Sequence, residues 1–246
     1  MTLKLLLMDK KYIYANQSSL WGEPECVGFG TDEFYVKEIE RKLANDLIVK
    51  NHYSKKTFNN TYINLGVFYK NNLNGVLQYG HLMNPSSSKN IVKNSNSYSC
   101  LELNRMWIAD NSKKYAESQA ISYSIKYIKK KYKKIKWIQS FADERCGGFG
   151  IVYQACSFNF YGEHISEFYI LDDVYFHSTY FTNIKGVSAS KSKKATMIRQ
   201  RIKECKKIKL RQFRYIKFID KREKKNCLLK QMTYPKHYKE GVEKNG

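Results

Sequence analysis

The order of helical and strand-like patterns between residues 31 and 184 is the feature that most limits the fold of this chain. A segment with apolar residues three and four apart is followed by short apolar runs, and this alternation then repeats. Such an order predicts a mixed α/β fold with a central sheet. The chain contains neither G-x-G-x-x-G nor a P-loop motif, so dinucleotide and nucleoside triphosphate binding lack their phosphate signature.

Two segments have clear helical periodicity. The first is predicted to begin at Thr31 or Asp32, either of which would cap it, and to end before Asn51; its apolar face is Val36, Ile39, Leu43 and Leu47. In the second, lysines crowd the carboxyl end, where the helix dipole favours cations, and the apolar face is Ile121, Ile125, Ile128 and Tyr132. A shorter helix is expected over 147–157.

The strand-like segments are short and separated by polar residues. Residues 62–69 and 75–79 predict an antiparallel hairpin. Further strands are expected over 101–108, 135–141, 168–171 and 174–181. Residues 84–98, rich in Asn and Ser, are predicted to be a mobile loop, and residues 1–30 contain no element that the pattern identifies.

Positive charge is concentrated in the last quarter of the chain. The net charge is +22, and residues 185–246 contain 21 Lys+Arg and 5 Asp+Glu, which gives +16 for that segment and leaves +6 for the other 184 residues. A field of this sign attracts polyanions, which favours nucleic acid as the partner. Aromatic and aliphatic residues lie between these cations. The segment is therefore expected to fold against the body, with a basic helix over 197–209 and a strand over 211–219.

The six cysteines do not form a C-x-x-C pair, so a zinc ribbon and a thioredoxin-like motif are both excluded. They are expected to be reduced thiols of an intracellular protein. The apolar start of the chain reaches only to Met8, which is too short for a signal peptide or a membrane span. We therefore expect a soluble, cytoplasmic protein.

Six short motifs follow one another along residues 31–236. They are Asn51-His52-Tyr53-Ser54, Leu103-Asn104-Arg105-Met106-Trp107, Glu117-Ser118-Gln119-Ala120, Ser140-Phe141-Ala142-Asp143-Glu144, Gly150-Ile151-Val152-Tyr153-Gln154-Ala155-Cys156 with Phe158 and Gly162, and Tyr234-Pro235-Lys236. Together they resemble the Mom family of phage DNA-modification proteins, whose fold is similar to that of acetyltransferases of the GNAT superfamily.

The resemblance implies a fold and an activity. The fold would be a mixed, mostly antiparallel sheet flanked by helices, with an N-terminal extension (1–30), a catalytic core (31–184) and a basic C-terminal extension (185–246). The activity would be conversion of the N6 amine of adenine in duplex DNA to a carbamoylmethyl form, which shields phage DNA from restriction in the host cytoplasm.

Two charged residues match the family motifs at predicted strands. Arg105 alternates with Leu103 and Trp107, so the three side chains are expected to share one face. A buried Arg needs an anionic partner, and Asp143 is the natural candidate. The resemblance gives both residues active-site roles, orienting the donor and the base; a purely structural ion pair is the alternative.

Three further positions are candidate catalytic residues. Tyr153 lies where related acyltransferases place a tyrosine that protonates the leaving thiolate, although a packing role is the alternative. His52 could act as a base, and Tyr53 could stack on an adenine extruded from the duplex. A metal site at His52 and Asp143 has no supporting spacing, so a metal requirement is left unknown.

The resemblance also implies acetyl-CoA or a related acyl donor. Its pyrophosphate would lie at the start of the helix that follows residue 115, where free backbone amides favour anions. The chain lacks the glycine-rich turn common in that superfamily, and Lys113, Lys114 and the Ser118 hydroxyl would take its place. Alternatively, Ser118 is only a helix-cap residue.

Double-stranded DNA is the expected partner, and no membrane contact is expected. The candidate phosphate contacts are Lys203, Lys206, Lys207, Lys209, Arg211, Arg214 and Lys236. Two other functions stay open: an ordinary N-acetyltransferase of a protein or small amine, and a DNA-binding protein without catalysis.

Overall fold

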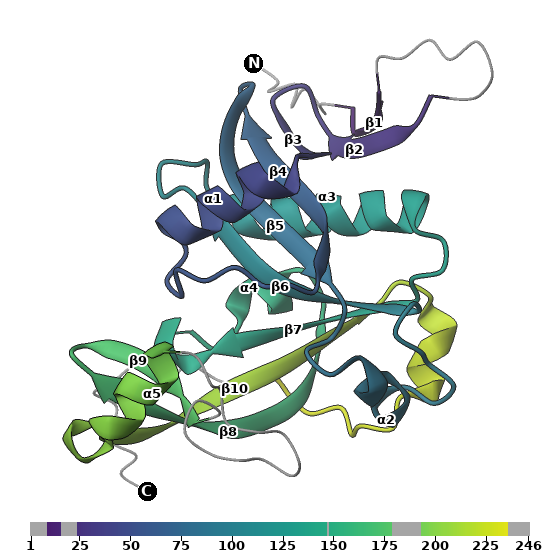
Figure 1. Cartoon of the computed structure of the whole chain (residues 1–246). Helices are drawn as coiled ribbons and strands as arrows, with labels where there is room; N and C mark the ends of the chain where they lie inside the picture. Colours follow the sequence, from purple (N-terminus) through teal and green to yellow (C-terminus); the bar gives the residue numbers. More distant parts are fainter. Residues whose placement is uncertain (1–8, 16–23, 147, 179–192, 236–246) are drawn as a thin grey trace, which may run out of the picture.

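A ten-stranded sheet runs through the molecule in the order β1-β2-β3-β4-β5-β6-β7-β10-β8-β9 (Figure 1). The computed structural model describes residues 9–15, 24–146, 148–178 and 193–235. Neighbouring strands pair antiparallel, except β6 and β7, which pair parallel. The strands are β1 (Lys11–Tyr14), β2 (Cys26–Gly30), β3 (Phe34–Glu38), β4 (Thr61–Tyr69), β5 (Asn72–Gly80), β6 (Cys100–Ile108), β7 (Trp137–Asp143), β8 (Asn159–Leu171), β9 (Val174–His177) and β10 (Lys206–Phe218).

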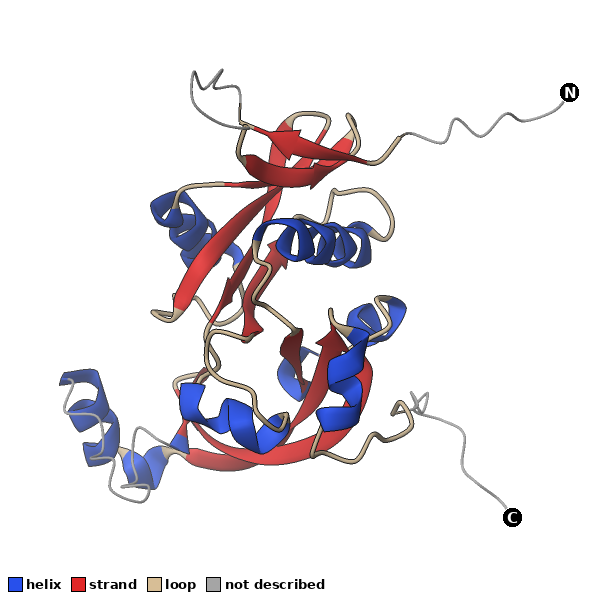
Figure 2. Ribbon diagram, turned by 90° about the vertical axis from the view of Figure 1, so that its right-hand side faces the viewer, coloured by secondary structure: helices blue, strands red, loops and turns tan. Residues whose placement is uncertain are grey.

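Helices cover both faces of this sheet, on opposite sides of the strands (Figure 2). On one face, Ala44 and Ile48 of α1 pack against Val76 of β5. On the other face, α3 buries Ile121 and Ile128 in the main core. The helices are α1 (Arg41–Asn51), α2 (Ser88–Ile91), α3 (Ala116–Lys131), α4 (Ile151–Ala155) and α5 (Lys193–Gln200). The predicted mixed, mostly antiparallel sheet flanked by helices is confirmed.

The prediction for the first helix is wrong at its start. The segment after Thr31 is strand β3, in which Phe34 and Val36 are fully buried while Lys37 is exposed, so the period is two rather than 3.6. Thr31 does not cap a helix, because its Oγ1 accepts a hydrogen bond from Phe34 N at 3.1 Å within a tight turn. Helix α1 begins ten residues later, at Arg41.

Part of the basic C-terminal segment is an interior strand of the sheet. β10 lies between β7 and β8 and is hydrogen-bonded to both, with Phe213, Tyr215, Ile216 and Phe218 buried. The predicted strand over 211–219 therefore exists but begins earlier, at Lys206. The predicted helix over 197–209 is wrong after residue 200, since α5 covers Lys193–Gln200. A short 3-10 helix and the start of β10 follow α5.

Three other segments differ from their predictions. Residues 84–98 are not a plain loop: a 3-10 turn leads into α2, and Ile91 and Val92 are buried beside Trp137. β8 starts at Asn159, nine residues before the predicted strand at 168. Its first part was not predicted because three exposed residues, Glu163 to Ile165, interrupt its pattern of burial. β1 and β2 extend the sheet with residues for which no element was predicted, and residues 179–181 of the last predicted strand lie outside the described residues.

Strands β6 and β7 diverge after a short parallel pairing. Only Cys100, Leu101 and Glu102 of β6 pair with β7. Two residues later, Asn104 is an extra residue opposite the Gln78–Tyr79 step of β5, which is a β-bulge. The bulge places Leu103 in the core with α3 and Trp107 in the cluster with α1. The expectation that Leu103 and Trp107 share a face is therefore wrong.

Two general features of the described residues complete the description. All six cysteines are free thiols. No helix in the described ranges has the length and the apolar composition needed to cross a membrane.

Candidate active site at the β6–β7 divergence

A cavity of about 310 Å³ lies where β6 and β7 separate. All five residues predicted to be catalytic line it: His52, Tyr53, Arg105, Asp143 and Tyr153. They come from four elements, namely the end of α1, β6, the last residue of β7, and α4. The divergence of two parallel strands thus brings together side chains that are far apart in the chain.

Residues from both faces of the sheet line the cavity. His52 and Tyr53 follow α1 on one face, whereas Ile151, Val152 and Tyr153 belong to α4, which packs with α3 on the other. Between them, residues 103–106 of β6 line the cavity along the edge that faces away from β5. Two reactants could therefore approach this cavity from opposite sides of the sheet.

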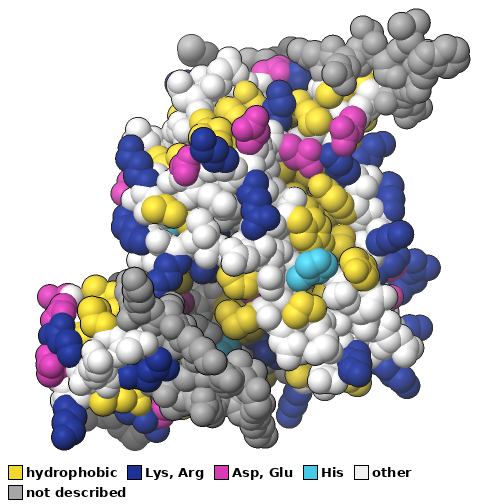
Figure 3. Space-filling view, in the orientation of Figure 1, with side chains coloured by type: hydrophobic (Ala, Val, Ile, Leu, Met, Phe, Trp, Pro, Cys, Tyr) yellow, Lys and Arg dark blue, Asp and Glu magenta, His cyan; other side chains and the backbone are white. Residues whose placement is uncertain are grey.

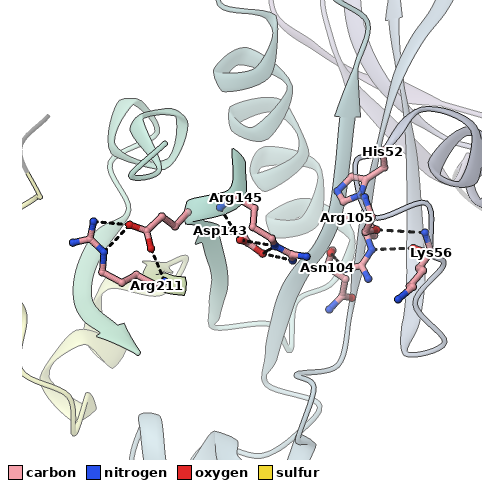
Figure 4. A network of polar contacts seen from close by, with 9 residues as sticks. His52, Lys56, Asn104, Arg105, Asp143, Arg145 and Arg211 are labelled. Atoms are coloured by element: carbon pink, nitrogen blue, oxygen red, sulfur yellow. Dashed lines mark hydrogen bonds and ion pairs between the residues drawn. The ribbon is translucent and has the colours of Figure 1, made fainter. Parts of the chain in front are cut away.

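The expected ion pair between Arg105 and Asp143 is absent, and Asp143 binds Arg145 instead (Figure 4). The Asp143 carboxylate accepts bonds from Arg145 N at 3.0 Å and from Arg145 Nε at 2.9 Å, with a further contact from Nη2. Arg105 Nε donates to the backbone oxygen of Lys56 at 3.1 Å, and its guanidinium lies over the Phe58 ring. The partners of the Arg105 guanidinium are therefore the backbone oxygens of Lys56 and Asn104 and the Phe58 ring, instead of a carboxylate.

His52 is buried and neutral. Its Nδ1 accepts a hydrogen bond from Ser54 N at 3.1 Å and lies 2.9 Å from Ser54 Oγ, which can donate to the same nitrogen. In the tautomer that the backbone bond requires, the proton of the neutral ring is on Nε2. Burial and the nearby Arg105 and Arg145 lower the pKa of His52 to about 4. This arrangement favours a hydrogen-bond donor at Nε2 over the base that the sequence suggested.

The two tyrosines of the cavity differ in exposure. Tyr53 is 53% exposed and packs on the His52 ring at 4.3 Å between centroids. Tyr153 is buried against Phe158 and Tyr215, and burial raises the pKa of Tyr153 to about 12. Tyr153 therefore remains protonated at neutral pH and can donate a proton, whereas Tyr53 offers an accessible aromatic face.

The three residues expected to bind the donor lie outside the cavity lining. Ser118 Oγ donates to Tyr115 O at 3.1 Å, in the first turn of α3. Lys113 lies over the Phe34 ring and Lys114 over the Tyr115 ring. This turn of α3 is in contact with the end of α4, the helix that lines the cavity: Cys156, the residue after α4, has its Sγ 3.2 Å from Ser118 O.

The residues expected to contact DNA fall into two groups. Arg211 is held by Glu144, with Nε to Oε1 at 2.9 Å and Nη2 to Oε1 at 2.7 Å, and Lys207 Nζ is 3.0 Å from Glu167. Arg214 lies over the Phe141 ring, and its buried Nε has no hydrogen-bond partner among the described residues. Lys203, Lys206 and Lys209 are exposed, and Lys236 lies outside the described residues.

Arg145 is the important residue that the sequence analysis missed. Its guanidinium lies 4.4 Å from the Phe168 ring centroid and 5.3 Å from that of Tyr53. The signal was the spacing of Asp143 and Arg145, since an Asp two residues before an Arg can close a local turn. The same spacing at Asp220 and Arg222 forms the same contacts on the surface.

A metal centre is not formed by the described side chains alone. In residues 9–15, 24–146, 148–178 and 193–235, no three His, Cys, Asp or Glu residues are grouped so as to hold a metal ion.

Similarity to known proteins extends over most of the chain. Residues 33–236 match the Mom protein family. The methylcarbamoylase mom of Escherichia phage Mu is 41% identical over 222 residues, covering 87% of this chain and 88% of that protein. Similar solved structures include the ribosomal-protein-S5-alanine acetyltransferase from Vibrio fischeri, which is 13% identical with a TM-score of 0.45 and covers 79% of this chain and 98% of that chain. Another is the ribosomal L7/L12 acetyltransferase RimL, which is 10% identical with a TM-score of 0.43 and covers 76% of this chain and 94% of that chain.

The family match and the match to the phage Mu relative each cover most of the chain. The family match spans the sheet from β3 to β10 and therefore includes every residue that lines the cavity. The chain belongs to the Mom protein family.

Proposed function

We propose that this protein modifies DNA, converting the N6 amine of adenine in duplex phage DNA to a carbamoylmethyl form that resists restriction. The observation that carries the proposal is the convergence of His52, Tyr53, Arg105, Asp143 and Tyr153 on one cavity. The name of the phage Mu relative, methylcarbamoylase, agrees with this activity.

The side of the cavity next to α1 suits a nucleobase. Chemistry on the adenine amine requires the base to leave the duplex, and aromatic faces stabilise an extruded base. Tyr53 provides such a face at 53% exposure, and His52 lies directly against it. The Nε2–H of neutral His52 would donate to a ring nitrogen or to an oxygen of the reacting group.

The side of the cavity next to α4 suits the acyl donor. Tyr153 is protonated and would supply a proton to a leaving thiolate. The start of α3 would hold the phosphates of a coenzyme A donor, because the first amides of this sixteen-residue helix lack intrahelical partners. Ser118 in its first turn, and Lys113 and Lys114 just before it, would contribute the side chains. A coenzyme A thioester would transfer an acyl group to the N6 amine and release the coenzyme A thiol, and the residues present fit its anionic part. This step gives an N6-amide, so the second nitrogen of the carbamoylmethyl product must come from the donor itself or from an amine co-substrate.

The positive charge of the chain suits a DNA substrate. In Figure 3, Lys and Arg side chains are scattered over the visible face and are most frequent along its right-hand edge. With a net charge of +22, the protein attracts DNA without reading its sequence, and the exposed Lys203, Lys206 and Lys209 would neutralise phosphates.

Mass spectrometry of nucleosides tests the proposal. Plasmid DNA from cells that express the protein should contain a carbamoylmethylated deoxyadenosine, and the product should vanish with Asp143→Ala. The matched control is Asp220→Ala, which removes the same kind of Asp–Arg turn outside the cavity and should leave the product in place. Unmodified DNA from cells with folded wild-type protein would refute the proposal, whereas an acetylated amine elsewhere would indicate an ordinary acetyltransferase.

A further inference from the structure

The mouth of the cavity next to α1 is positively charged. Lys55 and Lys56 are exposed in the loop after α1, Arg105 lies beside them on β6, and Arg145 follows β7. Burial is the largest cause of the lowered pKa of His52; Arg105, Arg145 and Lys55 lower it further, and one acid, Asp143, raises it. An anion at this mouth would therefore meet an excess of positive charge.

Arg145 is the best placed of these cations to bind a ligand. Asp143 holds its backbone N, Nε and Nη2, which leaves Nη1 without a hydrogen bond among the described residues. The guanidinium rests on an aromatic floor formed by Phe168 at 4.4 Å, Tyr53 at 5.3 Å and Tyr175 at 5.9 Å. Because Asp143 and the aromatic rings already hold the plane of this guanidinium, it loses little conformational freedom when it binds a phosphate.

Lys56 brings a second cation to the same region. Its backbone oxygen is fixed by Arg105 Nε, and its Nζ lies 5.9 Å from the centre of the Phe176 ring in β9. Figure 4 shows the Asp143–Arg145 pair on one side of the site and His52, Lys56 and Arg105 on the other. A backbone phosphate bound between these two sides would lie beside the cavity that the base enters.

The cations of β10 are less suited to this task. Arg211 and Lys207 are paired with Glu144 and Glu167, as Arg145 is with Asp143, so it is their place in the fold that sets them apart. Both also belong to a strand that lies beyond β7 from β6. They can attract the duplex, but residues at the mouth must hold the reacting nucleotide.

We propose that Arg145, assisted by Lys56, binds a phosphate of the DNA strand next to the adenine that enters the cavity, and that Asp143 is the positioning residue for Arg145. This inference rests on the proposed DNA modification. It assigns Asp143 a role different from that of a base, because every hydrogen bond that its carboxylate accepts from a described residue comes from Arg145.

The sharpest test removes charge from the ligand rather than from the protein. Duplexes with one modifiable adenine would carry a single neutral methylphosphonate at each neighbouring phosphate in turn, and binding and initial rate would be measured. We expect one position at which wild-type affinity falls about tenfold, the usual effect of losing a charged hydrogen bond. Arg145→Gln and Asp143→Asn should bind the normal duplex about as weakly and lose nothing further at that position.

Three controls show whether the effect belongs to Arg145 itself. Arg222→Gln removes the same charge and the same Asp–Arg turn on the surface and should keep the wild-type methylphosphonate sensitivity. Arg145→Lys should recover part of the affinity through charge alone. Thermal unfolding of each variant identifies any that fail to fold, and the wild-type methylphosphonate series does not depend on them.

The outcomes are distinct. If wild-type protein modifies DNA but Arg145→Gln remains as sensitive to the methylphosphonate as wild type, the inference is wrong and the proposed function stands. If Arg145→Gln instead weakens binding of acetyl-CoA and leaves DNA affinity unchanged, the phosphate at this site belongs to the donor, which also overturns the inference. If wild-type protein modifies no DNA, the proposed function itself fails.

Discussion

The proton on His52 is controlled by its neighbours in the cavity. Burial and two nearby guanidinium groups disfavour the charged ring, and Ser54 N occupies the nitrogen that would otherwise accept a proton. In the unfolded chain the same ring has its ordinary pKa of 6.5. The folded protein therefore binds fewer protons than the unfolded chain between about pH 6.5 and pH 4.

At the residue scale, this difference predicts a pH-dependent stability. Because the folded pKa is depressed, the contribution of His52 is fully present above pH 6.5 and is lost as the pH falls towards 4. After allowance for solvent screening of the neighbouring charges, the loss should be on the order of 1 kcal/mol. Urea unfolding at pH 7.5 and pH 5 should show a smaller loss for His52→Gln than for wild type. Equal losses in the two proteins would show that His52 is not the group responsible.

At the element scale, the position of α4 depends on the residue that precedes it. Gly150 has φ +81°, and a Cβ there would lie 2.5 Å from Tyr215 Cε2 and 3.0 Å from Ala142 Cβ. Both neighbours are buried in the sheet beneath the helix, so neither can move easily. A side chain at position 150 would push α4, and Tyr153 with it, away from the cavity.

Gly150→Ala should therefore destabilise the protein by roughly 2–4 kcal/mol, through the left-handed backbone and the clash together. Activity should fall as well. Gly148→Ala is the matched control, because Gly148 also lines the cavity but its Cβ would meet only Gly150 N, at 4.0 Å. Denaturant unfolding measures both variants, and similar destabilisation in the two would refute this role of Gly150.

Some helices and strands could be predicted from the sequence, and others could not. The β4–β5 hairpin was predictable from two apolar runs around a polar loop, β6 from alternating apolar and polar residues, and α3 from apolar residues at helical spacing. The helix predicted over β3 is wrong because Val36 and Ile39 also satisfy a spacing of three. The bulge at Asn104 leaves no periodic signal, since it lies where β6 and β7 diverge, and only a local two-residue spacing indicates the pairing of Asp143 with Arg145.

At the scale of the whole molecule, we expect the cations of β10 that form no ion pair to contribute more to DNA affinity than the one that is bound to a carboxylate. Lys206 and Lys209 form no ion pair among the described residues, whereas Arg211 is fixed by Glu144. Each phosphate contact contributes about 0.9 to the slope of log affinity against log salt concentration. The double variant Lys206→Gln, Lys209→Gln should reduce that slope by up to about 1.8.

Arg211→Gln should instead lower the free energy of unfolding by about 1 kcal/mol, with a smaller change in slope, because it breaks a charged bond to the turn that carries Arg145. Titration of nonspecific duplex DNA at several salt concentrations and urea unfolding distinguish the two effects. A larger change in slope for Arg211→Gln than for the double lysine variant would show that Arg211 contacts DNA directly.

The position of β10 in the sheet also affects when the protein becomes active during synthesis. Residues 206–218 separate β7 from β8, although those two strands are made more than thirty residues earlier. A nascent chain that has not yet released this segment from the ribosome has a gap in its sheet beside Asp143, and Glu144 lacks Arg211. Co-translational folding therefore leaves the turn of Asp143 and Arg145 unsupported until residues 206–218 have emerged from the ribosome.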